Sequence, residues 1–321
     1  MKILVISQDS TSMKKKMKFP PSCEDLLPTK IPIYKALHSE YMNEAASMFV
    51  DVQHKKVVEG VKVLKRVLGK DNVDFYILSA GFGLISADET IIPYSCSFDE
   101  MSIQEIMDRS KLLEIPKTLK NILGNTEYAL IFYILNKNYL LALNKAPAKA
   151  EAISVFFVDN DIPCKRKVVL TYSNELVSGY FAIGIKLGGS VAYKGGLFLA
   201  FSKALSSEKK PAEKLQKVSK TVSSFLKYMA ASNIASKLER VKMPPTAIKT
   251  LEEKETEKAT TELSATELSS VSTVSAEITT FTKKSRKPSS KKSVSAPKKE
   301  AKAAVKKEKP KKEAKAAVKK E

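Results

Sequence analysis

Four apolar segments limit the fold of this chain more than any other feature. They are KILVIS (2–7), VDFYILSA (73–80), EYALIFYIL (127–135) and AISVFFVD (152–159), and KRKVVLTY (165–172) is expected to add one more strand. The segments are rich in β-branched and aromatic residues and apolar on both faces, which is typical of strands buried in a parallel sheet. Helical segments separate them. This alternation predicts an α/β fold, with a mostly parallel sheet covered by helices.

The expected helices cover residues 33–49, 55–69, 102–115, 116–124 and 136–146. The second repeats Val57, Val61 and Leu64 along one face, and Gly69 suits a C-terminal cap. Ser102 and Glu105 have the spacing of a capping box. Between the first strand and the first helix lies a long loop with MKKKMKFPPS, and loops of this length at a strand end are often functional.

Three further regions complete the predicted organisation. Residues 179–205 indicate a strand, a Gly-Gly turn and a helix, and an amphipathic helix is expected from Pro211 to about residue 241. The pair Pro244-Pro245 marks the end of an α/β domain at 1–243. Residues 244–280 form a Ser/Thr/Glu-rich linker expected to be disordered, and residues 281–321 form a Lys/Ala-rich basic tail.

Charge points to a polyanionic partner. Residues 1–250 contain 36 Lys/Arg and 24 Asp/Glu, and residues 281–321 contain 17 Lys/Arg and 4 Glu. The tail repeats KKEAKAAVKKE at 298–308 and 311–321, and it resembles the tails of linker histones. Such a tail binds phosphates without sequence specificity, with DNA the expected partner, although a solubilising role is the alternative. The candidate contacts are Lys298, Lys299, Lys306, Lys307, Lys311, Lys312, Lys319 and Lys320.

Compartment and membrane association follow from simple counts. The three cysteines, Cys23, Cys96 and Cys164, are far apart in the sequence, which predicts a reducing compartment and no disulfide. The start MKILVIS is too short for a signal peptide, and the longest apolar run, eight residues, cannot span a bilayer. We therefore expect a cytoplasmic protein with no membrane partner. Association with the nucleoid is a further option for its location.

Metal and cofactor sites have no support in the sequence. The two histidines, His38 and His54, lie in or beside helical segments, without cysteines at metal-ligand spacing, and are expected on helix surfaces. The nearest approach to a phosphate-binding loop, GSVAYKG, has Tyr193 where glycine is needed. Neither a metal nor a cofactor is predicted.

Polar and glycine residues follow the predicted strands, at the edge where open parallel sheets bind ligands. Glycines there admit backbone N–H groups to a phosphate or base, and an aromatic ring between them could stack on a base. The alternative is a tight turn whose aromatic residue belongs to the core. The candidate binding residues are Ser7, Ser79, Gly81, Phe82, Gly83, Pro93 and Tyr94, with Asp9 and Asp88 as candidate acid/base groups.

The segment ILSAGFGLISADETIIPY resembles the strand–loop segment of the YaaA peroxide-stress proteins and related uncharacterised domains. The matching residues are Leu78, Ser79, Gly81, Phe82, Gly83, Leu84, Asp88, Ile92, Pro93 and Tyr94. Ser95 and Cys96 follow where those proteins have an arginine, and Gln8-Asp9 stands where related domains often have Cys or Lys. The resemblance implies an α/β domain with a positively charged cleft that binds DNA and limits oxidative damage.

Three functions therefore stay open. The first is a nucleic-acid-binding protein with a basic cleft and a polycationic tail, in DNA protection or stress response. The second is an enzyme acting on a nucleotide or nucleic-acid base, by N-glycosidic or base-modifying chemistry. The third is an inert scaffold whose amphipathic helix after Pro211 docks a partner.

Overall fold

The structure is a computed structural model that describes residues 1–242, without the side chains of the last five. The expected linker, the basic tail and all eight candidate lysines of the tail lie outside the described residues. Within residues 1–242, no helix combines the length and the apolar character that crossing a bilayer requires.

A six-stranded sheet in the order β4-β3-β1-β6-β7-β8 forms the centre of residues 1–242. All neighbouring strands are parallel except β4, which returns antiparallel to β3. The strands are β1 (Lys2–Gln8), β3 (Val73–Ser79), β4 (Gly83–Ser86), β6 (Tyr128–Ile134), β7 (Ile153–Phe156) and β8 (Lys167–Val169), and a separate pair joins β2 (Asn43–Glu44) to β5 (Thr90–Ile91). The prediction of a mostly parallel sheet is confirmed.

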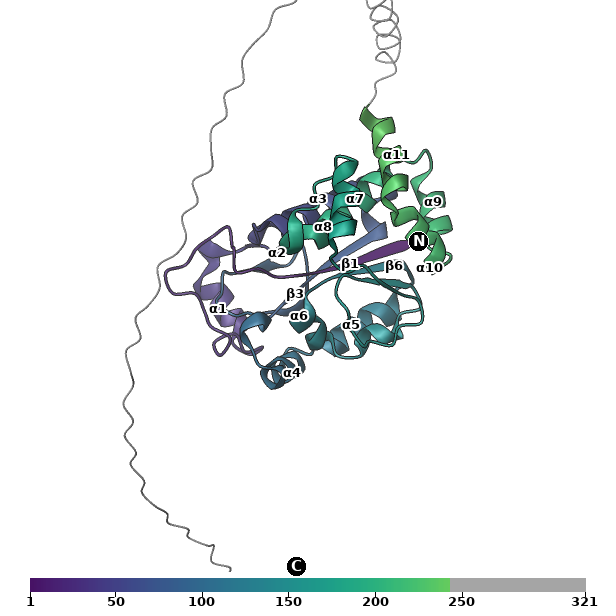
Figure 1. The fold of residues 1–321 in the computed structure, drawn as a ribbon. Coiled ribbons are helices and arrows are strands. Elements are labelled where there is room, and N and C mark those ends of the chain that lie inside the picture. The colour runs from purple at the N-terminus through teal and green to yellow at the C-terminus, as the bar shows by residue number, and fades with distance from the viewer. Residues whose placement is uncertain (243–321) are drawn as a thin grey trace, which may run out of the picture. The chain divides into compact units, whose positions relative to one another are not determined.

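Helices cover both faces of the sheet. The helices α3 (Val52–Leu68), α7 (Asn174–Ala182) and α8 (Gly189–Ser206) lie over one face, and α4 (Ile103–Leu112), α5 (Ile115–Asn125) and α6 (Lys137–Leu143) lie over the other (Figure 1). The remaining helices are α1 (Ile31–Leu37), α2 (Ala45–Met48), α9 (Pro211–Val218), α10 (Val222–Met229) and α11 (Ala231–Lys242). The prediction that helices cover the sheet is therefore confirmed.

The connections place a ligand crevice beside β1. From β1 the chain crosses through α3 to β3 on one side, whereas from β6 it crosses through α6 to β7 on the other. Such a reversal is where open α/β sheets bind ligands, beyond the carboxyl ends of the strands. The carboxyl ends of β1, β3 and β6 meet at this edge, because the register pairs Ser7 with both Ile77 and Ile134.

The segment 33–49 differs from the single helix that its sequence predicts. The helix α1 ends at Leu37, and Asn43–Glu44 then pairs with Thr90–Ile91 as the two-stranded sheet. The backbone N–H of Ala45 also donates to the carbonyl of Glu89 at 2.8 Å. These long-range hydrogen bonds outweigh the local helical pattern.

The expected strand within residues 179–205 is wrong, because the chain forms α7 there instead. The expected helix is α8, which begins at a bend formed by Gly188 and Gly189, both with positive φ, and a second glycine pair, Gly195 and Gly196, lies inside it. A Cβ on Gly195 would approach the carbonyl oxygen of Gln53 to 2.6 Å, and one on Gly60 would approach Phe198 to 2.7 Å. The glycines therefore allow α8 to pack closely against α3.

The amphipathic segment after Pro211 is three helices, α9, α10 and α11, rather than one. Thr221 begins α10 as its N-cap and accepts from the N–H of Ser224 at 3.1 Å. The apolar residues that predicted the helix are buried in the core, including Leu215, Phe225 and Met229. This face packs within the chain, so it does not offer the docking surface of the scaffold hypothesis.

Candidate functional site

A cavity of about 230 Å³ opens at the carboxyl edge of the sheet, beside the ends of β1 and β6. We call it the Asp9 pocket. Its walls come from the end of β1, the first turn of α3, the 3₁₀ turn at 98–100 and the start of α6. The lining residues are Ser7, Gln8, Asp9, Ser10, Thr11, Asp51, Gln53, His54, Val57, Ser97, Asp99, Tyr139 and Val191.

Asp9 is the most perturbed acid of this pocket. The residue is only 5% exposed, and its carboxylate accepts hydrogen bonds from the hydroxyls of Tyr94 and Tyr139 and, at 3.0 Å, from the N–H of Ala80. Burial raises the pKa of Asp9 to about 6 even though these hydrogen bonds lower it. A carboxyl group with this pKa exchanges protons near neutral pH, which suits general acid–base catalysis.

Both tyrosines beside Asp9 are held as proton donors. Burial and the charge of Asp9 raise the pKa of Tyr94 and of Tyr139 well above the ordinary value, so their hydroxyls keep their protons. Ser79 holds Tyr94 in place, with 2.7 Å between the two hydroxyl oxygens. The predicted site residues Ser79, Tyr94 and Asp9 therefore meet in one hydrogen-bonded cluster.

The Gly-Phe-Gly segment is the turn between β3 and β4, and it is buried. The backbone N–H groups of Gly81 and Phe82 donate to the hydroxyl of Ser79 at 3.1 Å, so a ligand would have to displace that bond to use them. Phe82 packs edge-on against Tyr94, with 5.2 Å between ring centroids. Gly83 has a φ of 83°, which only glycine adopts readily. The turn therefore supports Tyr94 rather than facing the pocket.

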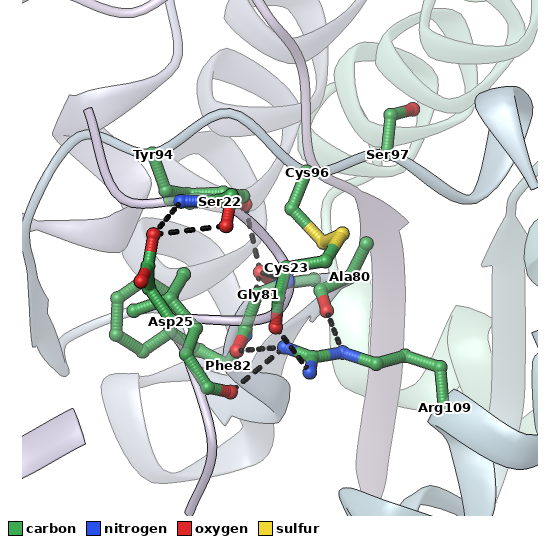
Figure 2. Close-up of a disulfide and its surroundings, with 12 residues drawn as sticks. Ser22, Cys23, Asp25, Ala80, Gly81, Phe82, Tyr94, Cys96, Ser97 and Arg109 are labelled. Carbon is green, nitrogen blue, oxygen red and sulfur yellow. Dashed lines mark hydrogen bonds between the residues drawn. A yellow bond between two sulfur atoms is a disulfide. The ribbon is translucent and has the colours of Figure 1, made fainter. Parts of the chain in front are cut away.

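Arg109 fastens this turn to the long loop after β1. Its guanidinium donates to the carbonyls of Ala80, Gly81, Cys23 and Leu26 at 2.7 to 3.1 Å (Figure 2). Burial lowers its pKa, and the side chain is 7% exposed. We call the turn at 80–82, the loop at 22–26 and Arg109 the hairpin wall.

A disulfide between Cys23 and Cys96 completes the hairpin wall, with 5.0 Å between the Cα atoms (Figure 2). The expectation of no disulfide is therefore wrong. Spacing in sequence concealed the pair, because the loop after β1 folds back and Ser22 forms a β-bridge with Ser95. Asp25 orders the same loop by accepting from the N–H of Ser22 at 2.9 Å, and this bond lowers the pKa of Asp25.

Asp88 lies away from Asp9. Because β4 runs antiparallel to β3, the chain travels back from Gly83 toward the amino end of β3, where the N–H of Ala87 donates to Phe75. Asp88 is exposed in the turn that follows. The structure thus does not bring the two predicted acid/base residues together, and Pro93 is buried beside Tyr94 without lining the Asp9 pocket.

His54 lines the Asp9 pocket and is buried, so the prediction that it lies on a helix surface is wrong. It is buried in the first turn of α3, and its Nε2 lies 2.9 Å from the carbonyl oxygen of Ala46. Burial lowers its pKa. The signal was present, because His54 precedes Val57, Val61 and Leu64 at helical spacing and so shares their buried face.

A second carboxylate, Asp99, lies at the exposed rim of the pocket. The side-chain amide of Asn136 donates to both of its oxygens at 2.8 Å. Lys194 from α8 is buried, and its Nζ donates to the carbonyl of Leu135 at 2.9 Å. Burial lowers the pKa of Lys194 to about 8, while the charge of Asp99 raises it. Sequence reasoning missed these residues and Tyr139, although Asn136 and Tyr139 directly follow a predicted strand.

Comparison of the chain with protein-family models, with curated proteins and with solved structures gives no match. The resemblance to YaaA proteins stays a prediction. Function is therefore argued from the geometry of the Asp9 pocket.

Proposed function

We propose that residues 1–242 form an enzyme that cleaves or exchanges the N-glycosidic bond of a nucleotide or nucleoside, with Asp9 as the acid/base group. The observation that carries this proposal is the position of Asp9, buried at a polar cavity between two tyrosine hydroxyls with a pKa of about 6. A second carboxylate, Asp99, lines the same cavity in a different environment, held by amide groups. Two carboxylates in contrasting environments are the usual equipment of glycosidic chemistry.

The proposed roles follow from these environments. Protonated Asp9 donates its proton to the departing base nitrogen as the bond to the sugar carbon breaks. The hydroxyls of Tyr94 and Tyr139 then stabilise the carboxylate that forms, since both already donate to it. Asp99 stabilises the positive charge that develops on the sugar, and a water molecule bonds to the sugar carbon and gives a proton back to the Asp9 carboxylate, so that free base and free sugar are released. In the exchange reaction an incoming base takes the place of the water. General acid catalysis of this kind contributes about 10²- to 10⁴-fold.

Release of free base tests the proposal. The full chain is incubated with ribonucleosides, deoxyribonucleosides, their 5′-monophosphates and short oligonucleotides, and the products are separated by chromatography. Asp9→Asn is expected to lower the rate about 100-fold or more, and Asp88→Asn, an exposed aspartate outside the pocket, serves as the matched control. Absence of base release from every compound, or equal rates for Asp9→Asn and wild type, would contradict the proposal.

A second function, nucleic-acid binding, is favoured by a separate observation. The loop after β1 exposes Lys14, Lys16 and Lys18 next to Phe19, whose ring is 79% exposed with the Nζ of Lys18 5.3 Å from its centroid. Exposed cations beside an exposed aromatic ring suit a nucleic-acid backbone and an unpaired base. We propose that this loop, together with the basic tail, contacts nucleic acid, with DNA as the first candidate and a cytoplasmic, nucleoid-associated location.

A filter-binding titration over a range of salt concentrations tests this second function. Deleting residues 281–321 should weaken binding and flatten its salt dependence. Replacing Lys14, Lys16 and Lys18 by Glu in the tail-less chain should abolish what is left, whereas Lys117→Glu with Lys120→Glu on α5 is the control. A tail-less chain that does not bind nucleic acid at low salt would limit binding to the tail.

A further inference from the structure

Three residues that line the Asp9 pocket each carry a polar side-chain atom without a hydrogen-bond partner among the described residues. These atoms are the hydroxyl of Ser7, Oε1 of Gln53 and Nδ1 of His54, and each atom is buried. Ser7 and His54 are 2% and 3% exposed as whole residues. A buried polar atom without a partner costs free energy, so several in one cavity point to a ligand that supplies the missing bonds.

The tautomer of His54 determines whether Nδ1, its nitrogen without a partner among the described residues, donates or accepts a hydrogen bond. The carbonyl oxygen of Ala46 can only accept, so Nε2 carries the proton of that hydrogen bond. In the neutral ring Nδ1 is then an acceptor, as is Oε1 of Gln53. The ligand group opposite them must therefore donate hydrogen bonds, as sugar hydroxyls do.

The charge of the pocket disfavours a phosphate. Asp9, Asp51 and Asp99 line it, and among the residues that the structure describes no Lys or Arg does so. The amide groups of Asn136 and Asn138 already donate to Asp99, and Lys194 donates to a carbonyl outside the lining. An anionic ligand would face carboxylates without a compensating cation.

The size and the rim of the Asp9 pocket also limit which ligand it can hold. The volume of about 230 Å³ is below the roughly 300–1,000 Å³ of pockets that enclose drug-sized ligands. The rim carries an apolar side chain, since the lining residue Val191 is 82% exposed. A small polar interior with an apolar rim fits one sugar inside and a flat base at the mouth.

We propose that the Asp9 pocket binds the unphosphorylated sugar of a free nucleoside, with Gln53 and His54 accepting hydrogen bonds from its hydroxyls and Ser7 completing the set. This inference rests on the proposed N-glycosidic function and narrows its substrate from nucleotides and nucleic acids to nucleosides.

Calorimetry with the full chain tests the substrate class. The probes are adenosine, guanosine, cytidine, uridine and their deoxy forms, each beside its 5′-monophosphate and its free base. We expect at least one nucleoside to bind about tenfold or more tightly than its monophosphate. Equal or tighter binding of the monophosphate overturns the inference but leaves the proposed function standing. Nucleoside binding without base release upholds the inference and overturns the function, and absence of all binding overturns both.

Two substitutions of His54 distinguish the effect of Nδ1, the proposed ligand contact, from that of Nε2, which bonds to Ala46. His54→Gln can keep the donor to Ala46 and removes the acceptor at Nδ1, whereas His54→Asn can keep the acceptor and removes the donor to Ala46. We expect His54→Gln to weaken nucleoside binding about tenfold with little change in melting temperature. His54→Asn should lower the melting temperature and retain more of the affinity. A His54→Gln protein that binds the nucleoside as wild type does overturns the inference.

Discussion

Two buried charges at the same edge of the sheet have opposite surroundings. Arg109 in the hairpin wall donates hydrogen bonds to four carbonyl oxygens, and all three nitrogens of its guanidinium take part. Asp9 accepts from three donors, but it lies at a cavity where Ser7, Gln53 and His54 each have a polar atom without a partner among residues 1–242. The guanidinium in the hairpin wall finds its hydrogen-bond partners within the chain, whereas several polar groups at the Asp9 pocket find none among the described residues. Burial of a charge therefore marks a site only where the surrounding polar groups are left unsatisfied.

Removal of Arg109 should have the largest effect on stability. Arg109→Met leaves three buried carbonyls and the half-buried carbonyl of Cys23 without their donor, at about 1–3 kcal/mol for each group that water cannot reach. We expect the free energy of unfolding to fall by about 3–5 kcal/mol in urea titrations. Arg109→Lys keeps the charge but not the fork, so it should recover only part of this loss. A loss below about 1 kcal/mol for Arg109→Met would show that the hydrogen bonds of Arg109 do not stabilise the hairpin wall.

The disulfide of the hairpin wall should have the next largest effect. Cys23 and Cys96 are 73 residues apart, and a cross-link over such a loop typically stabilises a protein by about 2–4 kcal/mol. Cys96→Ser or a reducing agent should lower the free energy of unfolding by this amount, measured with and without reductant. Cys164→Ser, at the one free cysteine of the described residues, is the control. A wild-type chain whose stability is independent of reductant would show that the pair is not bonded in solution.

Sequence reasoning reached the sheet because the four apolar segments carry their own signal. Each predicted strand from KILVIS to AISVFFVD is present, and the capping box of Ser102 and Glu105 forms at the start of α4. Errors arose where long-range contacts decide the local structure. The segment expected as a strand before α8 forms the helix α7 instead, and backbone pairing with residues 87–91 broke the segment 33–49.

The candidate site divides in the same way. Ser7, Asp9 and Ser79 were expected at the carboxyl edge because they lie at the ends of predicted strands, and Tyr94 was a candidate from the segment at 78–94. The structure brings these four residues together there. Asp88 was expected beside them from its position in the same segment, but the antiparallel return of β4 carries it to the opposite end. Cys23 and Cys96 meet only because a long loop folds back, and neither composition nor spacing contains that path.

Asp9 should make the stability of the protein depend on pH. Its pKa is raised from 3.8 to about 6 by burial, so the folded chain binds this proton more tightly than the unfolded chain does. The stabilisation by the protonated carboxyl is therefore full below about pH 4 and is lost as the pH rises through about 6, a difference of roughly 2–3 kcal/mol. Urea titrations from pH 4 to pH 7 should show this loss in wild type and not in Asp9→Asn. Parallel pH profiles of the two proteins would contradict the perturbed pKa.

The smallest expected effect concerns a single hydroxyl of the pocket. Tyr139→Phe removes the side-chain hydrogen bond that lowers the pKa of Asp9 most, so this pKa should rise further above about 6. The alkaline limb of the pH–rate profile, where Asp9 loses the proton it must donate, or the carboxyl resonance of Asp9 followed by NMR, should move by about 1 pH unit toward alkaline pH. Tyr128→Phe is the matched control, because its hydroxyl donates to Asp74 at 2.7 Å, at the amino end of β3. An equal shift in both variants, or none in Tyr139→Phe, would mean that burial alone sets the pKa of Asp9. In that case the two tyrosines would hold Asp9 in position, as the carbonyls of the hairpin wall hold Arg109, without setting its pKa.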